Sequence, residues 1–178
     1  HEGISLPAAL ASRGIDLDKV LEAGGELDHA AAYVELHIEQ GPSLEQAGLA
    51  MGTVVGTVGV ERHMLRFRGQ AAHSGATPMH LRRDAFLAAA KMAQEIYEIA
   101  ARHQGLCTIG DCRTLPGVPT SVVGESQIWL DQRHLDADLL AAMWQEAQDA
   151  ARRFAGEGHV ELGVFPVWSI APVTFHPE

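Results

Sequence analysis

Two long amphipathic segments constrain the fold of this 178-residue chain more than any other feature. The first is predicted to be a helix over about residues 83–102, and the second a helix that begins after an N-cap at Asp136 and ends at Gly156. A helix with one apolar stripe must cover a hydrophobic surface. Apolar residues recur at steps of three and four, and the predicted stripes are Phe86, Ala90, Ala93, Tyr97 and Ala100 in the first helix and Leu139, Leu140, Met143, Ala147, Ala150 and Phe154 in the second.

Segments with the alternating pattern of strands flank both helices. Residues 60–69 precede the first helix, and residues 159–165 follow the second. Between the helices, residues 106–115 and 126–134 are joined by a turn-rich segment and are expected to pair. The resulting order, βαββαβ, predicts an α+β fold for residues 59–178, a ferredoxin-like antiparallel sheet with both helices on one face.

The first 58 residues are predicted to form a separate and incomplete unit. Two short helices, broken at Arg13-Gly14, are expected to precede a strand over residues 31–41, and a third short helix should follow. Hydroxyl side chains are expected to cap the first and the third of these helices: Ser5 and Ser43. Because a lone strand needs other strands to bury its apolar face, residues 1–58 are interpreted as part of a larger α/β domain, with a boundary near residues 56–59.

Composition narrows the class of protein. Hydrophobic residues make up 47% of the chain, which is enough for a folded core. The 13 Lys and Arg against 23 Asp and Glu give a formal charge of -10, which disfavours nucleic acid and anionic membranes as partners. No apolar run is long enough to span a membrane, and the two cysteines, Cys107 and Cys112, lack a metal or disulfide pattern. We therefore expect a soluble, cytoplasmic protein.

His37 is the first candidate for a functional residue, because it lies near the end of the predicted strand between Glu35 and Glu39. A single histidine is more often a core or surface residue than a ligand. However, the run AAYVELHIEQGPSL (residues 31–44) resembles a motif of the N-carbamoyl-L-amino-acid hydrolases and allantoate amidohydrolases, a branch of the dinuclear zinc peptidase and aminoacylase superfamily. The resemblance implies that His37 is a metal ligand and that Gln40 contacts substrate.

A second candidate, His73, lies in the glycine-rich loop GQAAHSGATPMHLRRDA (residues 69–85). Small residues in a loop let the backbone approach another molecule closely, although a solvated turn is the simpler interpretation. The loop closely resembles one in the smaller domain of the same enzymes. The resemblance implies that His73 reaches into the active site of a partner subunit and stabilises an oxyanion there.

The segment LPGVPTSVVGESQIWLDQRH (residues 115–134) resembles a third motif of the family, a turn followed by a strand that ends in D-x-R. The resemblance implies that Arg133 binds the substrate carboxylate, which suits a planar guanidinium. Thr120 stands where the family has asparagine, and Val123 stands where it has proline. Thr120 is therefore expected to hold the substrate differently from an asparagine carboxamide.

Together the motifs imply a metal-dependent amidohydrolase that cleaves the carbamoyl or ureido C–N bond of N-carbamoyl-L-amino acids or allantoate-like substrates. The resemblance implies a divalent metal pair (zinc, manganese or cobalt), a homodimer formed through the lid domain at residues 59–178, and a partial catalytic domain at residues 1–58. His37 is the one metal ligand expected in this chain, which is therefore expected to be an inactive fragment on its own. Two alternatives remain open: a non-catalytic dimerisation or binding module, and a deacylase or peptidase of the same superfamily.

Overall fold

The computed structural model describes residues 3–176 and divides the chain into two compact units, His1–Gly52 and Thr53–Glu178. The division lies six residues before the boundary predicted between residues 58 and 59. Within the described residues, no helix is both long enough and apolar enough to cross a bilayer.

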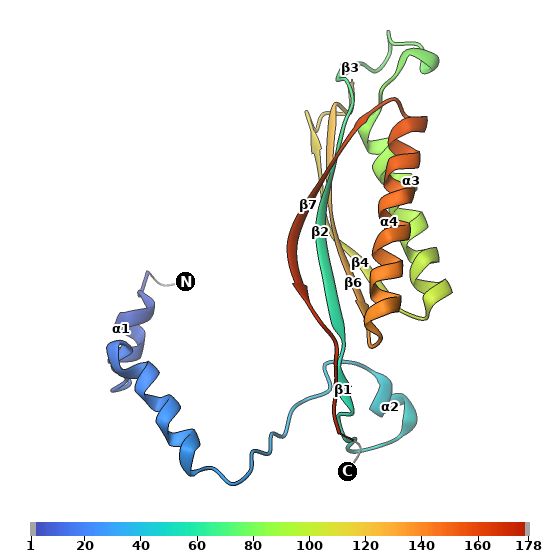
Figure 1. The fold of residues 1–178 in the computed structure, drawn as a ribbon. Helices are drawn as coiled ribbons and strands as arrows, with labels where there is room; N and C mark the ends of the chain where they lie inside the picture. Colours follow the sequence, from blue (N-terminus) through green and yellow to red (C-terminus); the bar gives the residue numbers. More distant parts are fainter. Residues whose placement is uncertain (1–2, 177–178) are drawn as a thin grey trace. The chain divides into compact units, whose positions relative to one another are not determined.

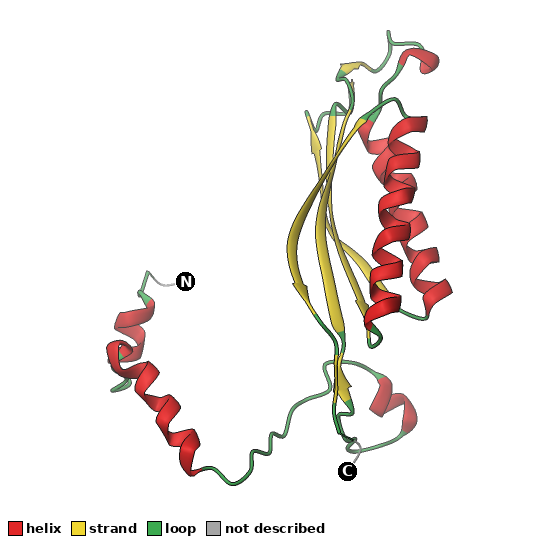
Figure 2. Ribbon diagram, viewed as in Figure 1, coloured by secondary structure: helices red, strands yellow, loops and turns green. Residues whose placement is uncertain are grey.

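The larger unit is built on a four-stranded antiparallel sheet with the strand order β4-β6-β2-β7. Helices α3 and α4 both cover one face of this sheet and leave the other face open (Figures 1 and 2). This arrangement confirms the predicted ferredoxin-like α+β fold. The elements are β2 (Gly59–Arg68), α3 (Ala85–His103), β4 (Leu106–Leu115), β6 (Glu125–His134), α4 (Ala137–Glu157) and β7 (Glu161–Ile170).

Short elements extend both ends of the larger unit. Strand β1 (Gly56–Thr57) pairs with β8 (Val173–Thr174), so the chain enters and leaves the unit side by side. At the other end of the sheet, β3 (Ala72–His73) pairs with β5 (Ser121–Val122), and a 3-10 turn, η2 (Met79–Leu81), follows β3. The loop predicted over residues 69–79 therefore contains a short ladder at its centre.

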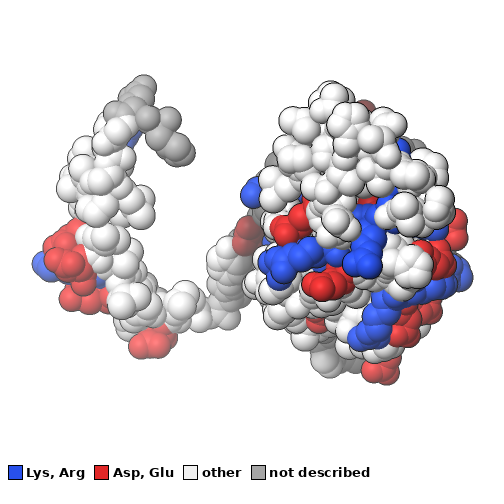
Figure 3. All heavy atoms as spheres, turned by 90° about the horizontal axis from the view of Figure 1, so that it is seen from above, with Lys and Arg blue, Asp and Glu red and all other residues white. Residues whose placement is uncertain are grey.

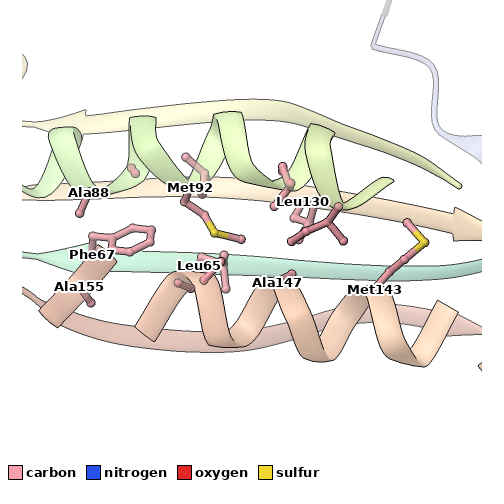
Figure 4. Packing of buried hydrophobic residues seen from close by; sticks show 14 of the residues in the cluster. Leu65, Phe67, Ala88, Met92, Leu130, Met143, Ala147 and Ala155 are labelled. Carbon is pink, nitrogen blue, oxygen red and sulfur yellow. The ribbon is translucent and has the colours of Figure 1, made fainter. Parts of the chain in front are cut away.

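The core lies between the helices and the covered face of the sheet (Figure 4). Strand β2 contributes Leu65 and Phe67, as its alternation predicted, and both side chains are fully buried. Helix α4 also buries most of its predicted stripe, including Met143 and Ala147, while Leu139 at its start is exposed. The fourth strand is longer than predicted and runs to Ile170, because it pairs with β2 along its whole length through a register shift.

The stripe predicted for α3 is largely wrong, since only Ala100 of its five residues is buried. The helix buries a neighbouring face that includes Met92, Ile96 and Ile99, whereas Phe86 and Tyr97 are about half exposed, at 46% and 53%. The helix is rich in alanine, and alanines lie on several of its faces. Two adjacent stripes therefore both satisfy the three-and-four spacing, and periodicity alone does not choose between them. Ion pairs also link α3 to α4, and they join Lys91 to Glu157, Arg153 to Glu95, and Arg102 to Glu146.

The two long helices begin and end where the sequence suggested. Asp84 and Asp136 are the N-caps of α3 and α4, and each carboxylate accepts hydrogen bonds from two backbone N–H groups of the first turn. Helix α3 ends at His103, and its C-cap residue Gln104 is in the left-handed conformation. Gly105 follows because a Cβ there would lie 2.5 Å from the sulfur of Met143.

The smaller unit contains three short helical elements: α1 (Leu6–Ala11), a 3-10 helix η1 (Leu17–His29) and α2 (Ser43–Ala47). The predicted break at Arg13-Gly14 lies between α1 and η1, and Ser5 caps α1 through a hydrogen bond from the Ala8 N–H. The cap predicted at Ser43 is wrong. The carboxylate of Glu39 instead accepts hydrogen bonds from the Ser43 and Leu44 N–H groups at 2.9 and 3.0 Å.

The strand predicted over residues 31–41 is also wrong. This segment is irregular, and the residues of its expected apolar face, Val34, Leu36 and Ile38, are exposed. Its alternation is real, but a strand exists only where a neighbour supplies hydrogen-bond partners. None of the strands within residues 3–176 pairs with it.

Candidate functional site

The loop after β3 fixes the protonation pattern of His73. Its Nδ1 atom accepts hydrogen bonds from the backbone N–H groups of Gly75 and Ala76, both at 3.1 Å. A ring nitrogen that accepts in this way carries no proton, so the proton of the neutral ring is on Nε2. The exposed His73 therefore presents an N–H donor from Nε2, which is the group needed to stabilise a negatively charged oxygen.

Arg82 holds this loop in place. Its guanidinium donates from Nη2 to the Ser74 carbonyl at 2.6 Å and from Nε to the Thr77 carbonyl at 3.1 Å. Sequence reasoning gave Arg82 no role. The sequence did contain a hint of this role, because loop carbonyls need hydrogen-bond donors and a long cationic side chain follows the loop closely.

Thr120 lies beside His73. The carbonyl of Thr120 accepts a hydrogen bond from the Ser74 N–H at 3.0 Å, and Ser121 lies opposite His73 in the β3–β5 ladder. The structure thus brings together two of the predicted site residues at one end of the sheet. Both are exposed and accessible to a ligand.

Arg133 lies on the open face of the sheet and contacts Asp131 on the same strand. Its Nε atom is 2.7 Å from Asp131 Oδ1, and Arg62 of β2 donates from Nε to Asp131 Oδ2 at 2.9 Å. Burial opposes ionisation of Asp131, but hydrogen bonds from Arg133 and Arg62 outweigh it and hold the pKa of the carboxyl below its usual value. The hydrogen bond with Asp131 likewise raises the pKa of Arg133.

A pocket of about 490 Å³ opens beside this charged group, and Trp129 and Thr108 line it together with Arg62 and Arg133. Sequence reasoning missed Arg62 and Asp131 as members of the site. Arg62 faces Asp131 only because β2 and β6 pair in this register. On the face of the larger unit shown in Figure 3, basic and acidic side chains are interspersed.

The two groups of site residues lie at opposite ends of the sheet. His73 and Thr120 precede the start of β6 at Glu125, whereas Arg133 is near its end. At about 3.3 Å per residue, the eight steps from Glu125 to Arg133 alone separate them by roughly 25 Å. One small substrate therefore cannot contact both His73 and Arg133 of the same copy.

His37 and Gln40 lie in the smaller unit. The exposed His37 donates from Nδ1 to the carbonyl of Ile38, which leaves the lone pair of Nε2 free for a metal ion. Gln40 has a positive φ of 58°, which is uncommon for a residue with a side chain. Among the described residues, no three His, Cys, Asp or Glu side chains gather into a metal-binding cluster. Within residues 3–176, His37 is not part of such a cluster, and its role as a metal ligand stays a prediction.

No family model matches the chain. Over 174 residues, which are 97% of the chain, it is 38% identical to N-carbamoyl-L-amino acid amidohydrolase of Geobacillus stearothermophilus, of which it spans 42%. It is also 32% identical over 149 residues, 83% of the chain, to allantoate amidohydrolase of Escherichia coli (strain K12), of which it spans 36%.

A solved structure with the same fold is the hydantoinase/carbamoylase family amidase from Burkholderia ambifaria. It matches 99% of the chain with a TM-score of 0.81 and 32% identity, and the chain covers 42% of it. The chain thus spans less than half the length of these relatives. Sequence and fold together place it in the hydantoinase/carbamoylase family of amidohydrolases.

Proposed function

We propose that this chain is part of a cytoplasmic, metal-dependent amidohydrolase that hydrolyses the carbamoyl or ureido C–N bond of a substrate with a carboxylate. The observation that carries the proposal is the 38% identity to an N-carbamoyl-L-amino acid amidohydrolase over 97% of the chain. Water attacks the carbamoyl carbonyl, and the C–N bond breaks to release ammonia, carbon dioxide and the free amine.

Residues of the larger unit bind and polarise the substrate. The Nε2–H group of His73 donates to the carbonyl oxygen that becomes negative as water attacks, while Arg133 binds the carboxylate. Thr120, next to His73, contacts the same end of the substrate through its hydroxyl. A divalent metal pair of zinc, manganese or cobalt would supply activated water, with His37 as one ligand and Gln40 near the substrate.

We propose further that one active site uses residues from two copies of the chain. The separation of His73 from Arg133 along the sheet supports this, because a carbamoyl amino acid is far shorter than roughly 25 Å. In a homodimer, His73 and Thr120 of one copy would act on a substrate held by Arg133 of the other. The site would be incomplete without the partner.

The surface proposed for dimerisation is the β4 edge together with the adjoining flank of α3. Among residues 3–176, strand β4 is an edge of the sheet, and its ten residues have no partner strand on that side. Lys91 and Glu95 form ion pairs with α4, so they lie on the flank of α3 that is next to α4. A second stripe lies on the other side of the buried face of α3 and is turned away from α4. That stripe is the apolar set Phe86, Ala90, Ala93 and Tyr97, none of which is fully buried.

Activity is tested on the full-length protein, loaded with Zn²⁺, Mn²⁺ or Co²⁺. Ammonia release is measured from N-carbamoyl-L-amino acids, allantoate and 3-ureidopropionate, with N-acetyl amino acids and dipeptides as the comparison. Release from at least one carbamoyl or ureido compound, abolished by a chelator, is expected. Cleavage of only the acetyl or peptide substrates would favour a deacylase or peptidase, and no cleavage at all would favour a binding module.

Mixed dimers test the shared active site. Subunits with His73→Ala and subunits with His37→Ala should each be inactive alone. Random mixing makes half of the dimers heterodimers, each with one complete site of two, so about a quarter of the wild-type activity should return. Verified heterodimers without any activity would show that His73 does not act across the interface.

A further inference from the structure

Asp131 lies between two arginines that come from neighbouring strands. The β2–β6 register places Arg62 directly opposite Asp131, and Arg133 follows two residues later on the same face. Arg62 Nε and Arg133 Nε contact different oxygens of the carboxylate, at 2.9 and 2.7 Å. A carboxylate that needs one cation for neutrality therefore has two.

The three side chains carry a net charge of +1. Asp131 stays ionised, for the reasons given above, and both guanidinium groups are permanently charged. Each guanidinium has five N–H donors and gives only two of its nitrogens to Asp131. The side chains of Arg62 and Arg133 are 37% and 43% exposed, so their other donors remain within reach of a ligand.

Arg62 is also fixed from its other side. Its guanidinium carbon lies 5.3 Å from the ring centroid of Trp168 on β7, a cation–π distance, so the side chain is held between Trp168 and Asp131. Both arginines line the same 490 Å³ pocket. A ligand carboxylate that enters this pocket meets two positioned guanidinium groups. The net positive charge that they keep after pairing with Asp131 would balance the negative charge of the ligand.

We propose that Arg62 is a second carboxylate-binding residue and that Arg62, Asp131 and Arg133 form a site for ligands with a single carboxylate at this position. The inference rests on the proposed function to the extent that the ligand is its carbamoyl substrate. A purely structural role for Arg62 leaves its charge unexplained, because Arg133 alone neutralises Asp131. A bound carboxylate balances that charge and uses the remaining donors.

The test is a titration of the chain with N-carbamoyl-L-alanine, followed by NMR of the arginine Nε–Hε groups. Arg62→Gln should weaken binding by about tenfold, the typical effect of losing one charge-assisted hydrogen-bonding partner. Arg62→Lys keeps the charge but not the planar fork, so its affinity should lie between those of the unaltered chain and Arg62→Gln. Arg66→Gln is the matched control, because Arg66 is on the same face of β2, stacks on Phe165 and does not line the pocket.

A second ligand separates direct binding from support of the fold. N-carbamoyl-L-alaninamide lacks the carboxylate, so Arg62→Gln should leave its binding unchanged. Equal weakening of both ligands would overturn the inference and assign Arg62 a structural role. Unchanged carboxylate binding in Arg62→Gln, with loss in Arg133→Gln, would also overturn it but leave the proposed function intact. No binding to the unaltered chain, or no effect of Arg133→Gln, would count against the carboxylate site in both proposals.

Discussion

His63 is buried in the larger unit although histidine is polar, and its environment favours the neutral ring. It is 6% exposed, and its ring stacks on that of Trp144 with 3.5 Å between centroids and 7° between planes. Burial lowers the pKa of His63, and nearby Glu61 only partly opposes this effect. Within the described residues its Nδ1 atom has no hydrogen-bond partner.

His63 should therefore make stability depend on pH. Its pKa in the folded state lies below the unfolded value of about 6.5, so its contribution is complete above that pH and is lost as the pH falls towards the folded-state pKa. Urea unfolding followed by tryptophan fluorescence should show a lower unfolding free energy at pH 5.5 than at pH 7.5. His63→Phe should reduce this difference, whereas His80→Gln on the exposed η2 should not. An identical pH dependence in His63→Phe would refute the assignment.

Single residues were predictable where a motif or a local rule determines their role. The sequence placed His73 in a loop and Asp136 at a helix N-cap, but the tautomer of His73 depends on where the Gly75 and Ala76 N–H groups point. Arg62 was missed because its partner is 69 residues away and is identified only by strand register. Contacts of that kind require the fold before they can be predicted.

At the scale of elements, the order of the strands and helices in the larger unit followed from pattern, while helix rotation, strand pairing and the length of the last long strand did not. Both long helices were located, but α3 has two stripes that satisfy the same spacing. Residues 31–41 have a strand pattern and no partner strand among the described residues, so pattern alone did not make a strand. Both errors have one cause, since a sequence pattern describes one element and burial depends on two.

The rotation of α3 is open to a direct test. Ile96→Ala removes a fully buried side chain from the core and should lower the unfolding free energy by about 2–5 kcal/mol. Leu87→Ala on the outer face of the same helix should cost much less, because that side chain is 54% exposed. Denaturant unfolding of both variants gives the comparison, and a larger loss for Leu87→Ala would contradict the observed rotation.

At the scale of the whole molecule, the proposed dimer makes a prediction about α3. Tyr97→Glu places a charge at the C-terminal end of its outer apolar stripe and should weaken self-association, because a buried unpaired charge is costly. Sedimentation velocity over a concentration series should show a shift towards monomer, without a change in far-ultraviolet circular dichroism. Leu139→Glu at the start of α4 is the control and should leave the association unchanged. A Tyr97→Glu protein that associates like the wild type would place the interface elsewhere.

The β1–β8 ribbon brings the two ends of the larger unit together. Residues 56–57 and 173–174 are hydrogen-bonded neighbours, and the Phe175 N–H donates to the Val55 carbonyl at 2.9 Å. The polypeptide between these two strands therefore begins and ends at neighbouring positions. The unit is therefore suited to domain insertion, because a host chain can be joined to it at two adjacent positions. It is also suited to circular permutation, in which its ends are fused and new termini are opened in a distant turn while the sheet and both helices are kept.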